Sequence, residues 1–429
     1  QVIDYVKNLH FDDADIEYLR GLGIFDEDFL EYLHNFKFSG NIYAIPEGTV
    51  VFPREPLVKV IAPIMEAQLV ETAILNIINH QSLIATKTSR IVFAARGDGI
   101  MEFGLRRAQG ADAGTYGARA AMIAGCIGTS NVLAGKLFDV PVKGTHAHSW
   151  IMSFPDELTA FRAYAKLYPS ACILLADTYD TLGSGVPNAI RVFQEMRDAG
   201  IPLTFYGIRL DSGDLAYISK KARKMLDEAG YPDCTICASN SLDEYLIQDL
   251  LLQDAKLDSF GVGENLITSK NEPVFGGVYK LVAIENDNGE LIPKIKLSET
   301  AQKITTPGFK EVYRFYGRDN GKALADYIVL AGEEVDDTKP ITIFDPNDIW
   351  KKKTLTNFRA EKLQVQIFKK GVQCYTAPSL EEIRSYSAAQ MDTLWDEIKR
   401  FEYPHTYYVD LSQKLWETKQ RLMEEMNQQ

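Results

Sequence analysis

The stretch Pro141-Val142-Lys143-Gly144-Thr145-His146-Ala147-His148-Ser149-Trp150 holds two of the chain's six histidines, two residues apart. We interpret it as a β-strand that runs into a polar end led by a glycine. Because side chains alternate along a strand, His146 and His148 would project from the same side. Similar short strands with polar ends recur on both sides of this stretch. This recurrence decides the fold class.

Short apolar runs alternate with helical patterns between about residues 90 and 285. Each run ends in glycine, an acid, arginine or Ser/Thr, and the spacing of roughly 15 to 35 residues allows one crossover helix per strand. About seven such units predict an irregular α/β barrel, with functional residues at the carboxyl ends of its strands. The expected strand ends are 101–106, 128–131, 144–148, 173–177, 205–211, 235–240 and 259–263.

The segments before the barrel follow other patterns. Residues 1–40 are expected to be helical, with Asp13 or Asp15 capping one helix and Asp26 capping the next. Antiparallel strands are expected next, and then a long, mostly buried helix. The strands are expected at 42–45, 50–52 and 57–61, and the helix at 66–88.

The segment after residue 285 is expected to begin with hairpins. Asn288-Gly289 and Asn320-Gly321 are turn dipeptides between strand-like runs. Ser379 and Glu382 form a capping-box pattern, which predicts the start of a helix. A last amphipathic helix is indicated by Leu411, Leu415, Leu422 and Met426.

Composition bounds the function. The chain has 429 residues, of which 46% are hydrophobic and 24% charged, enough for two or three domains with large cores. Its net charge of −13 argues against nucleic-acid binding, which needs a basic face, but allows a small phosphorylated ligand. The five cysteines are scattered and make no disulfide framework, which indicates a reducing cytoplasm. We find no membrane-spanning or secretory segment.

The stretch Ile208-Arg209-Leu210-Asp211-Ser212-Gly213-Asp214 joins an arginine, an acid and a Ser-Gly loop at one expected strand end. An arginine beside backbone amides suits a phosphate, and a carboxylate suits Mg²⁺ or a sugar hydroxyl. A surface turn with a salt-bridged arginine explains the same residues. Asp177, at an earlier strand end, is likewise either a ligand contact or a helix cap.

Two further strand ends suggest ligand contacts. A flat anionic ring could stack on Phe103 and pair with Arg106 or Arg107, although a core phenylalanine beside a solvated basic pair is the alternative. Phe260-Gly261-Val262-Gly263 either lets a ligand approach the backbone or permits tight packing of strand and helix. Cys234-Thr235-Ile236-Cys237 has no second cysteine pair, so we interpret it as core.

A same-face pair of histidines also suits zinc in a metal-dependent barrel hydrolase. Such a site needs further ligands from later strands. None of the other histidines, His10, His34, His80 and His405, lies at a later strand end. The hydrolase is therefore disfavoured, but carboxylates could replace the missing histidines, so it stays an alternative.

Taken together, these motifs resemble those of nicotinate phosphoribosyltransferase over roughly residues 40 to 340. Residues 296–299 and 306–310 are similar to the family's segment after the barrel. Six stretches match in the same order: 102–108, 128–134, 144–149, 208–214, 238–240 and 260–263.

The resemblance implies the reaction and the fold. The family joins nicotinate to 5-phosphoribosyl 1-pyrophosphate, giving nicotinate mononucleotide and pyrophosphate in NAD salvage, and couples this to ATP hydrolysis through a phosphohistidine. The implied fold is an incomplete α/β barrel plus an α/β sandwich domain, and the implied assembly is a homodimer. We assign residues 1–95 to an N-terminal helical and sandwich segment, 96–285 to the barrel, and 286–429 to a C-terminal segment that completes the sandwich and ends in a helical tail.

The resemblance also implies roles for single residues. His148 would be the phosphorylated histidine, and an exposed imidazole at a strand end is a competent nucleophile. The other catalytic candidates are Asp177, Arg209 and Asp211. Mg²⁺ would be held through pyrophosphate, with Asp177 and Asp211 as its candidate protein ligands. The phosphoribosyl group would be held by Arg209, Asp211, Ser212 and Gly213, its 5-phosphate by Ser239, Asn240, Gly261 and Gly263, and the pyridine ring by Phe103 and Arg106.

The identity of the base is expected to depend on Gly128-Thr129-Ser130-Asn131. The related nicotinamide enzyme carries Asp where this chain has Ser130, and a carboxylate there would repel nicotinate. Ser130 and Asn131 are therefore expected to favour the acid as substrate. Family members begin earlier, with a Thr-Asp-Xaa-Tyr segment whose tyrosine stacks on the pyridine. Either that segment precedes Gln1 in the complete protein, or the ring pocket lacks it. In the second case the alternative is a non-catalytic relative that binds nucleotide.

Overall fold

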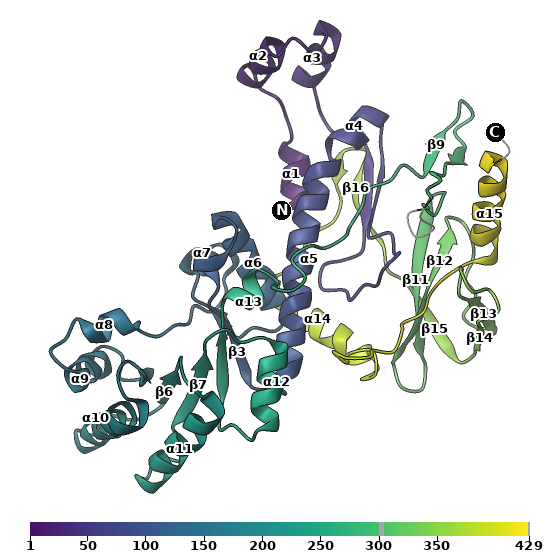
Figure 1. Cartoon of the computed structure of the whole chain (residues 1–429). Helices are drawn as coiled ribbons and strands as arrows, with labels where there is room; N and C mark the ends of the chain where they lie inside the picture. Colours follow the sequence, from purple (N-terminus) through teal and green to yellow (C-terminus); the bar gives the residue numbers. More distant parts are fainter. Residues whose placement is uncertain (300–303, 428–429) are drawn as a thin grey trace. The chain divides into compact units, whose positions relative to one another are not determined.

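The computed structural model describes residues 1–299 and 304–427 (Figure 1). The chain divides into two compact units. The first, here called the terminal unit, combines Gln1–Ile78 with Gly276–Gln429, and the second, the central unit, is Asn79–Phe275. No helix of the described residues is long and apolar enough to cross a membrane.

The terminal unit begins with the expected helices, α1 (Val2–Asn8), α2 (Asp13–Gly21) and α3 (Glu27–His34). Asp26 caps α3 as predicted, because its Oδ1 accepts a hydrogen bond from Phe29 N at 2.8 Å. The predicted cap of α2 is wrong. Asp12 caps it, since Asp12 and Asp15 accept each other's backbone N–H in a capping box.

The first sheet of the terminal unit joins segments from both ends of the chain. Its antiparallel order is β17-β16-β1-β2, with bounds β1 (Asn41–Ala44), β2 (Val58–Ile61), β16 (Val365–Lys369) and β17 (Val372–Gln373). Residues 50–52, predicted as a strand, form none. Phe52 instead stacks on the Tyr407 ring, with centroids 3.8 Å apart.

Helices and sheet share one core in this unit. The predicted helix over 66–88 is in fact two helices, α4 (Ile64–Leu69) and α5 (Glu71–Ala94), and the division between the units falls within α5. Burial of their apolar side chains against the sheet stabilises both elements. The buried cluster contains Val6, Phe36, Phe38, Ile42, Val70, Ile74, Ile367 and Phe368.

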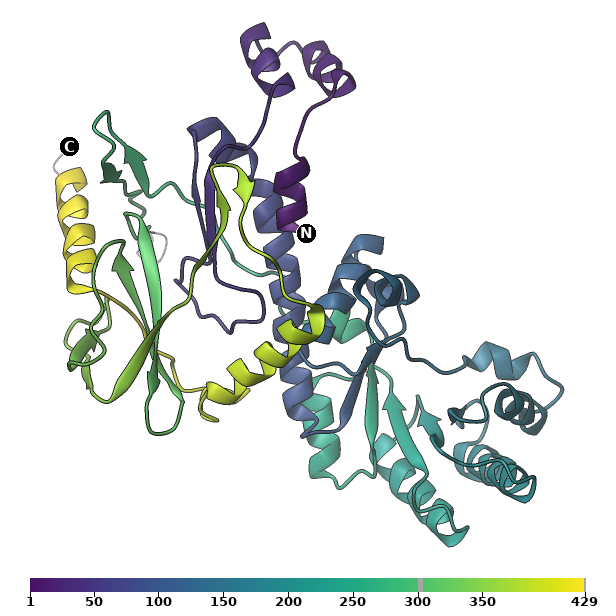
Figure 2. The same cartoon turned by 180° about the vertical axis from the view of Figure 1, so that it is seen from behind.

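The second sheet has the order β15-β11-β12-β18, and only β18 runs parallel to its neighbour. Asn320-Gly321 makes the predicted turn between β11 and β12, with Gly321 at φ +67°. The C-terminal helix α15 lies beside this sheet (Figure 2). Leu415 of α15 packs on the sheet, whereas Leu411 lies in β18 and not in the last helix as predicted. The bounds are β11 (Lys310–Gly317), β12 (Ala323–Leu330), β15 (Phe358–Lys362), β18 (Val409–Leu411) and α15 (Gln413–Asn427).

Smaller elements complete the terminal unit. Asn288-Gly289 makes the predicted turn between β9 (Ala283–Glu285) and β10 (Leu291–Pro293). A second hairpin pairs β13 (Ile341–Phe344) with β14 (Lys352–Leu355). Ser379 and Glu382 form the predicted capping box at the start of α14 (Leu380–Thr393).

The central unit is built on one parallel sheet in the order β4-β3-β8-β7-β6-β5. Its strands are β3 (Gly99–Glu102), β4 (Gly128–Thr129), β5 (Cys172–Leu175), β6 (Tyr206–Leu210), β7 (Thr235–Ser239) and β8 (Ser259–Val262). Six of the seven expected strands therefore form. Most residues of β5 and β7 are buried. Cys234 and Cys237 belong to the core as predicted.

The seventh expected strand, within Pro141–Trp150, is wrong. Only Val142 pairs, in an isolated parallel bridge with Thr129 of β4, and α8 begins at His148. Pro141 has no N–H to donate, and the residues that follow are too polar and exposed to line a buried strand. Since β4 and β5 are both edge strands, the sheet is an incomplete barrel that is open on this side.

Helices follow the strands of the central unit and connect them. They are α6 (Ala111–Ile123), α7 (Val132–Phe138), α8 (His148–Met152), α9 (Glu157–Leu167), α10 (Val186–Asp198), α11 (Leu215–Glu228), α12 (Glu244–Leu252) and α13 (Glu264–Ile267). A 3₁₀ turn, η1 (Leu105–Arg107), follows β3, and a π-helical turn, η2 (Thr181–Gly185), precedes α10. The mixed α/β architecture agrees with the predicted fold class.

Candidate active site at the strand ends

The carboxyl ends of the parallel strands bring the expected site residues together. The sheet register pairs Leu175 with Arg209, Ser239 with Gly261 and Glu102 with Thr129. Asp177, Asp211 and Phe103 follow within two residues of these positions. Side chains from far-apart parts of the sequence therefore meet along one edge of the sheet.

Asp177 is the centre of this arrangement. Its side chain is only 1% exposed, and its Oδ1 lies 3.1 Å from His148 Nε2. Its Oδ2 accepts hydrogen bonds from Asp211 N at 2.8 Å and from Ser212 Oγ at 2.6 Å. The carboxylate thus fixes both the histidine ring and the loop after β6, whereas the ring itself, 38% exposed, is open to a ligand.

Arg209 links the ends of β6 and β7 to the loop that contains Thr145. Its Nη2 donates to Asp211 Oδ1 at 2.9 Å and its Nε to Ser239 Oγ at 2.8 Å. Its Nη1 donates to Thr145 Oγ1 at 2.9 Å, which holds the loop that replaces the seventh strand. Ser239 Oγ also donates to Asp211 Oδ1. Because the guanidinium is fixed in position and keeps further N–H groups, it can receive a phosphate or pyrophosphate oxygen.

The loops after β6 and β7 have unusual backbone conformations. Gly213 has φ +78°, and Asn240 and Ser241 have φ +99° and +48°. Left-handed conformations at residues other than glycine are uncommon and gather at functional sites. Asn240 and Ser241 are exposed, so their backbone amides can reach a ligand.

Gly261 has a packing reason to be glycine. A Cβ added to it would lie 2.5 Å from Cδ2 of Phe103. Gly263 is also near this residue, because its added Cβ would lie 3.2 Å from Phe103 O. The Phe103 ring lies 5.9 Å from the Arg209 guanidinium. The glycines therefore let an aromatic ring lie over the sheet edge beside a cation, and a direct phosphate contact by them stays a prediction.

The expected ring-binding residues directly follow β3 and β4 in the sequence. Arg106 is exposed on η1, and among the described residues its side chain makes no hydrogen bond or ion pair, whereas Arg107 lies 3.3 Å from Glu264. Ser130 is exposed at the end of β4. Asn131 is buried and caps α7 by accepting from Ala134 N at 3.1 Å, so its side chain already has a structural task.

His146 differs from the expectation. Its Nε2 accepts a hydrogen bond from Leu175 N at 3.2 Å, and its ring packs on Trp150 and Tyr164. Burial, with a smaller effect of the Arg209 charge, lowers the pKa of His146 to about 4. The prediction that His146 and His148 form a same-face pair on a strand is wrong, because His148 bonds to Asp177 from a helix.

This geometry also bears on metal binding. A zinc site needs both histidines to converge on one ion, yet the Nε2 atoms of His146 and His148 have different partners. In the part of the chain that the structure describes, no three potential metal ligands come together. Among those residues, Asp211 Oδ2 is a carboxylate oxygen of the site without a hydrogen bond, so it is available to a cation.

Comparison with known proteins decides the family. The profile of the nicotinate phosphoribosyltransferase (NAPRTase) family matches residues 99–331. The profiles of the N-terminal and C-terminal domains of nicotinate phosphoribosyltransferase match residues 1–79 and 309–419. The chain belongs to the nicotinate phosphoribosyltransferase family.

Members of this family resemble the chain over almost its whole length. It is 48% identical to a nicotinate phosphoribosyltransferase of Bacillus subtilis, over 99% of this chain and 86% of that protein. It is 39% identical to one of Mycobacterium tuberculosis, over 96% of this chain and 82% of that protein. The crystal structure of human nicotinic acid phosphoribosyltransferase superposes with a TM-score of 0.84 at 29% identity, covering 98% of this chain and 90% of the human one.

Two residues of the site escaped the sequence analysis. Thr145 lay in a recognised family motif, but only the structure shows that it holds Arg209. Glu102 is fully buried, although acids are rarely found in a core. The signal that could have identified Glu102 was an acid at the end of an apolar strand, directly before Phe103 of the family motif.

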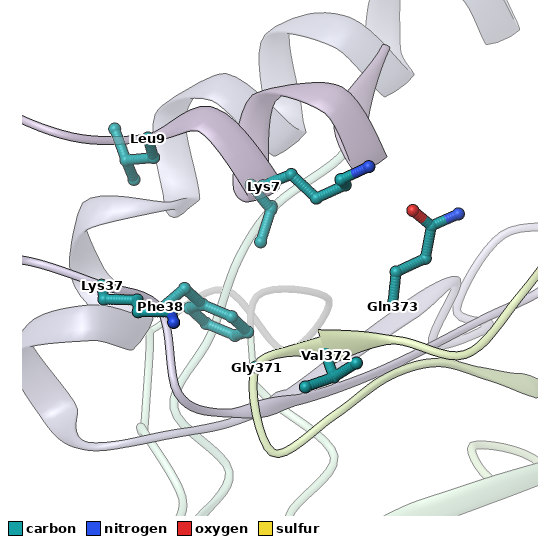
Figure 3. A pocket seen from close by; sticks show the side chains of 8 residues that line it. Lys7, Leu9, Lys37, Phe38, Gly371, Val372 and Gln373 are labelled. Atoms are coloured by element: carbon teal, nitrogen blue, oxygen red, sulfur yellow. The ribbon is translucent and has the colours of Figure 1, made fainter.

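A pocket of about 430 Å³ lies in the terminal unit (Figure 3). Lys7 of α1 and Gln373 of β17 line it, together with Val6, Leu9, Lys37, Phe38, Gly371 and Val372. All of these residues belong to the terminal unit, whereas the strand-end residues belong to the central unit. This pocket and the strand-end site are therefore different features of the molecule.

Proposed function

We propose that this protein is a nicotinate phosphoribosyltransferase that transfers the phosphoribosyl group of 5-phosphoribosyl 1-pyrophosphate to nicotinate in NAD salvage. The observation that carries this is the network of His148, Asp177, Arg209, Asp211 and Ser239 at the strand ends. It joins a cation for phosphates, a carboxylate for the ribose and an accessible imidazole in one place.

In the transfer, the bond from ribose C1 to pyrophosphate breaks and a bond to the ring nitrogen of nicotinate forms. Positive charge develops at C1, and a carboxylate such as that of Asp211 favours it. Arg209 receives phosphate oxygens, and the loops after β6 and β7 supply backbone N–H groups. Nicotinate needs no base, because its ring nitrogen has a free lone pair. The protein's contribution is mainly positioning.

The residues fit a Mg²⁺ that is held through pyrophosphate. Asp177 already accepts three hydrogen bonds, which leaves Asp211 Oδ2 as the better protein ligand. Bound Mg²⁺ would neutralise the leaving pyrophosphate. Asp211 would then bind the ion while its other oxygen stays fixed by Arg209.

The base is expected between Phe103 and Arg106 on one side and Ser130 on the other. Arg106 is exposed and has no partner among the described residues, which suits the nicotinate carboxylate, and the Ser130 hydroxyl adds no competing charge. Ser130→Asp should raise the KM for nicotinate, because its carboxylate would face the carboxylate of the base and like charges repel at short distance. A kinetic assay of the wild type and of Ser130→Asp at saturating phosphoribosyl pyrophosphate measures this KM.

ATP coupling would proceed on His148. Since Nε2 bonds to the Asp177 carboxylate, Nδ1 carries the lone pair. Nδ1 attacks the γ-phosphorus of ATP, the bond from that phosphorus to the β–γ bridging oxygen breaks, and ADP leaves. Asp177 stabilises the positive charge on the ring during the attack. Water later hydrolyses the phosphohistidine to phosphate.

Incubation with γ-labelled ATP tests this coupling. Acid-labile, base-stable label should appear on the wild type and on His34→Ala, an exposed histidine of α3, but not on His148→Ala. Phosphoribosyl transfer need not disappear in His148→Ala, because the chemistry at ribose asks for positioning and charge. Label retained by His148→Ala would rule out this histidine as the phosphoryl acceptor. His146→Ala is a poorer control, since it removes a buried ring.

The proposal includes a cytoplasmic homodimer. All five cysteines are free thiols, which suits a reducing compartment. Four aliphatic side chains on α7 and the loop after it are at least half exposed: Val132, Leu133, Leu137 and Val142. Leu133 and Leu137 lie one turn apart on the same face of α7, as an interface between copies would require.

A further inference from the structure

Glu102 is a buried acid that the reaction scheme above does not use. It is the last residue of β3 and is 0% exposed. Burial raises the pKa of Glu102, although its hydrogen bonds to Thr129 and Gly104 favour the ionised form. No cation of the described chain pairs with it. A carboxyl group in such a place has a structural or functional reason to be there.

The two oxygens of Glu102 bind donors on different strands. Oε2 accepts a hydrogen bond from Thr129 Oγ1 of β4 at 2.6 Å, and Oε1 accepts one from Gly104 N, just after β3. Thr129 Oγ1 in turn accepts from Asn131 N at 3.0 Å. The Glu102 carbonyl accepts from Ser130 N, also at 3.0 Å. One residue therefore ties the chain after β3 to the chain after β4.

These tied segments are the two sides of the expected base pocket. Gly104 is the residue before η1, which carries Arg106, and it follows Phe103. Gly104 cannot be fixed by a side chain of its own, because an added Cβ would lie 2.4 Å from Ile267 Cβ. Its position along the strand edge is thus set by its backbone N–H, and Glu102 holds that group.

We propose that Glu102 is a positioning residue that sets the distance between the Phe103–Arg106 side and the Ser130 side of the pocket, and thereby the affinity for the pyridine carboxylate. The inference rests on the proposed function. Glu102 does not touch the base, because it is buried. Loss of its carboxylate should weaken the binding of the base. The Arg209 network, which holds phosphoribosyl pyrophosphate, should stay in place.

Steady-state kinetics of four variants test this, with KM measured for nicotinate and for phosphoribosyl pyrophosphate. Glu102→Ala should raise the nicotinate KM about tenfold or more and leave the other KM within about twofold. Glu102→Gln should raise the nicotinate KM less, since the amide oxygen can accept a hydrogen bond from Gly104 N while the amide nitrogen donates one to Thr129 Oγ1. Thr129→Val, which removes the hydrogen bond from β4 to Glu102 and also the acceptor for Asn131 N, should raise the nicotinate KM as well.

Glu157→Gln is the matched control. Glu157 is another buried acid of the central unit, at the start of α9, and accepts a hydrogen bond from Asn188 Nδ2 at 2.9 Å. The Glu157→Gln substitution should change thermal stability without a selective change in the nicotinate KM. If Glu102→Ala does not fold, Glu102→Gln and Thr129→Val carry the test.

The inference is overturned if the nicotinate KM of the Glu102 and Thr129 variants stays within about twofold of the wild type. It is equally overturned if both KM values rise together, since that would be a general structural effect. Wild-type turnover in the same assay reports separately on the proposed function. If the wild type forms nucleotide and the variants keep the wild-type KM for nicotinate, the role of Glu102 is contradicted and the proposed function is not.

Discussion

At the scale of single residues, the site depends on side chains that hold each other in place before any ligand arrives. Asp177 has both oxygens engaged, and Arg209 is fixed by Asp211, Ser239 and Thr145. Groups fixed in this way lose little freedom on binding and need little rearrangement during the reaction. The exposed groups beside them, His148 and Arg106, are the ones left for ligands.

Arg209→Ala should weaken the binding of phosphoribosyl pyrophosphate. Loss of a charged hydrogen-bond donor costs about 1.5–3 kcal/mol, which corresponds to a roughly 10- to 150-fold higher Kd. Titration calorimetry measures this directly. Arg162→Ala, which breaks an exposed ion pair with Glu195, is the control and should bind as the wild type does. Unchanged binding by Arg209→Ala would assign the arginine to a structural salt bridge.

His146 should make stability depend on pH. Its pKa of about 4 lies below the value of about 6.5 in an unfolded chain, so the unfolded state binds the proton more readily. The stabilisation is complete above about pH 6.5 and is lost as the pH falls toward 4. Between about pH 7 and pH 5, this histidine alone should remove about 2 kcal/mol from the free energy of unfolding.

Urea unfolding at the two pH values measures this effect. His146→Gln keeps an acceptor for Leu175 N but cannot be protonated, so its loss of stability over the same pH range should be smaller. An equal loss in the wild type and in His146→Gln would show that other groups cause it.

At the scale of elements, close packing of β8 against the turn after β3 sets the position of the aromatic ring. Gly261→Ala would put a methyl group 2.5 Å from Phe103 Cδ2. The ring must move, at a cost of about 1–3 kcal/mol, and the nicotinate KM should rise with the loss of thermal stability. Gly21→Ala, at the end of α2 where nothing lies within 4 Å, is the control. A Gly261→Ala enzyme with wild-type stability and KM would contradict this packing account.

Much of the element pattern could be predicted from local sequence, and the failures have identifiable causes. Strands such as 172–175 are continuous apolar runs, and the Ser379 capping box depends on neighbours three residues apart. The segment at His146 and His148 alternates like a strand, yet too few of its residues are apolar to bury it. Its hydrogen bonds go to Arg209 and Asp177, which are distant in sequence, so no local pattern could show them.

The same limit applies to the site. The type of chemistry at each strand end could be predicted, because arginine, acid and glycine stand where parallel strands end. Which groups contact each other could not. Thr145 and Glu102 act through hydrogen bonds to residues 64 and 27 positions away, and such contacts exist only once the sheet has formed.

At the scale of the whole molecule, the chain is acidic and binds, by our proposal, anionic substrates. The net charge of −13 does not prevent the binding of anions, because the proposed site has its own cations, Arg209 of β6 and Arg106 of η1. By our proposal, the exposed aliphatic side chains on α7 belong to an interface between two copies of the chain. Leu137→Glu should shift the assembly from dimer toward monomer in sedimentation equilibrium, whereas Leu252→Glu, at the end of α12, should not. A wild type that sediments as a monomer would contradict the homodimer.

The central claim is that this protein makes a nucleotide from a pyridine carboxylate. The most direct test is to compare kcat/KM for nicotinate and for nicotinamide with phosphoribosyl pyrophosphate and Mg²⁺, following nucleotide and pyrophosphate together. The account predicts stoichiometric nicotinate mononucleotide and pyrophosphate, and a kcat/KM for nicotinate at least about a hundredfold higher, since Arg106 pairs with a carboxylate and Ser130 does not repel it. A preference for nicotinamide, or no nucleotide from either base, would contradict it.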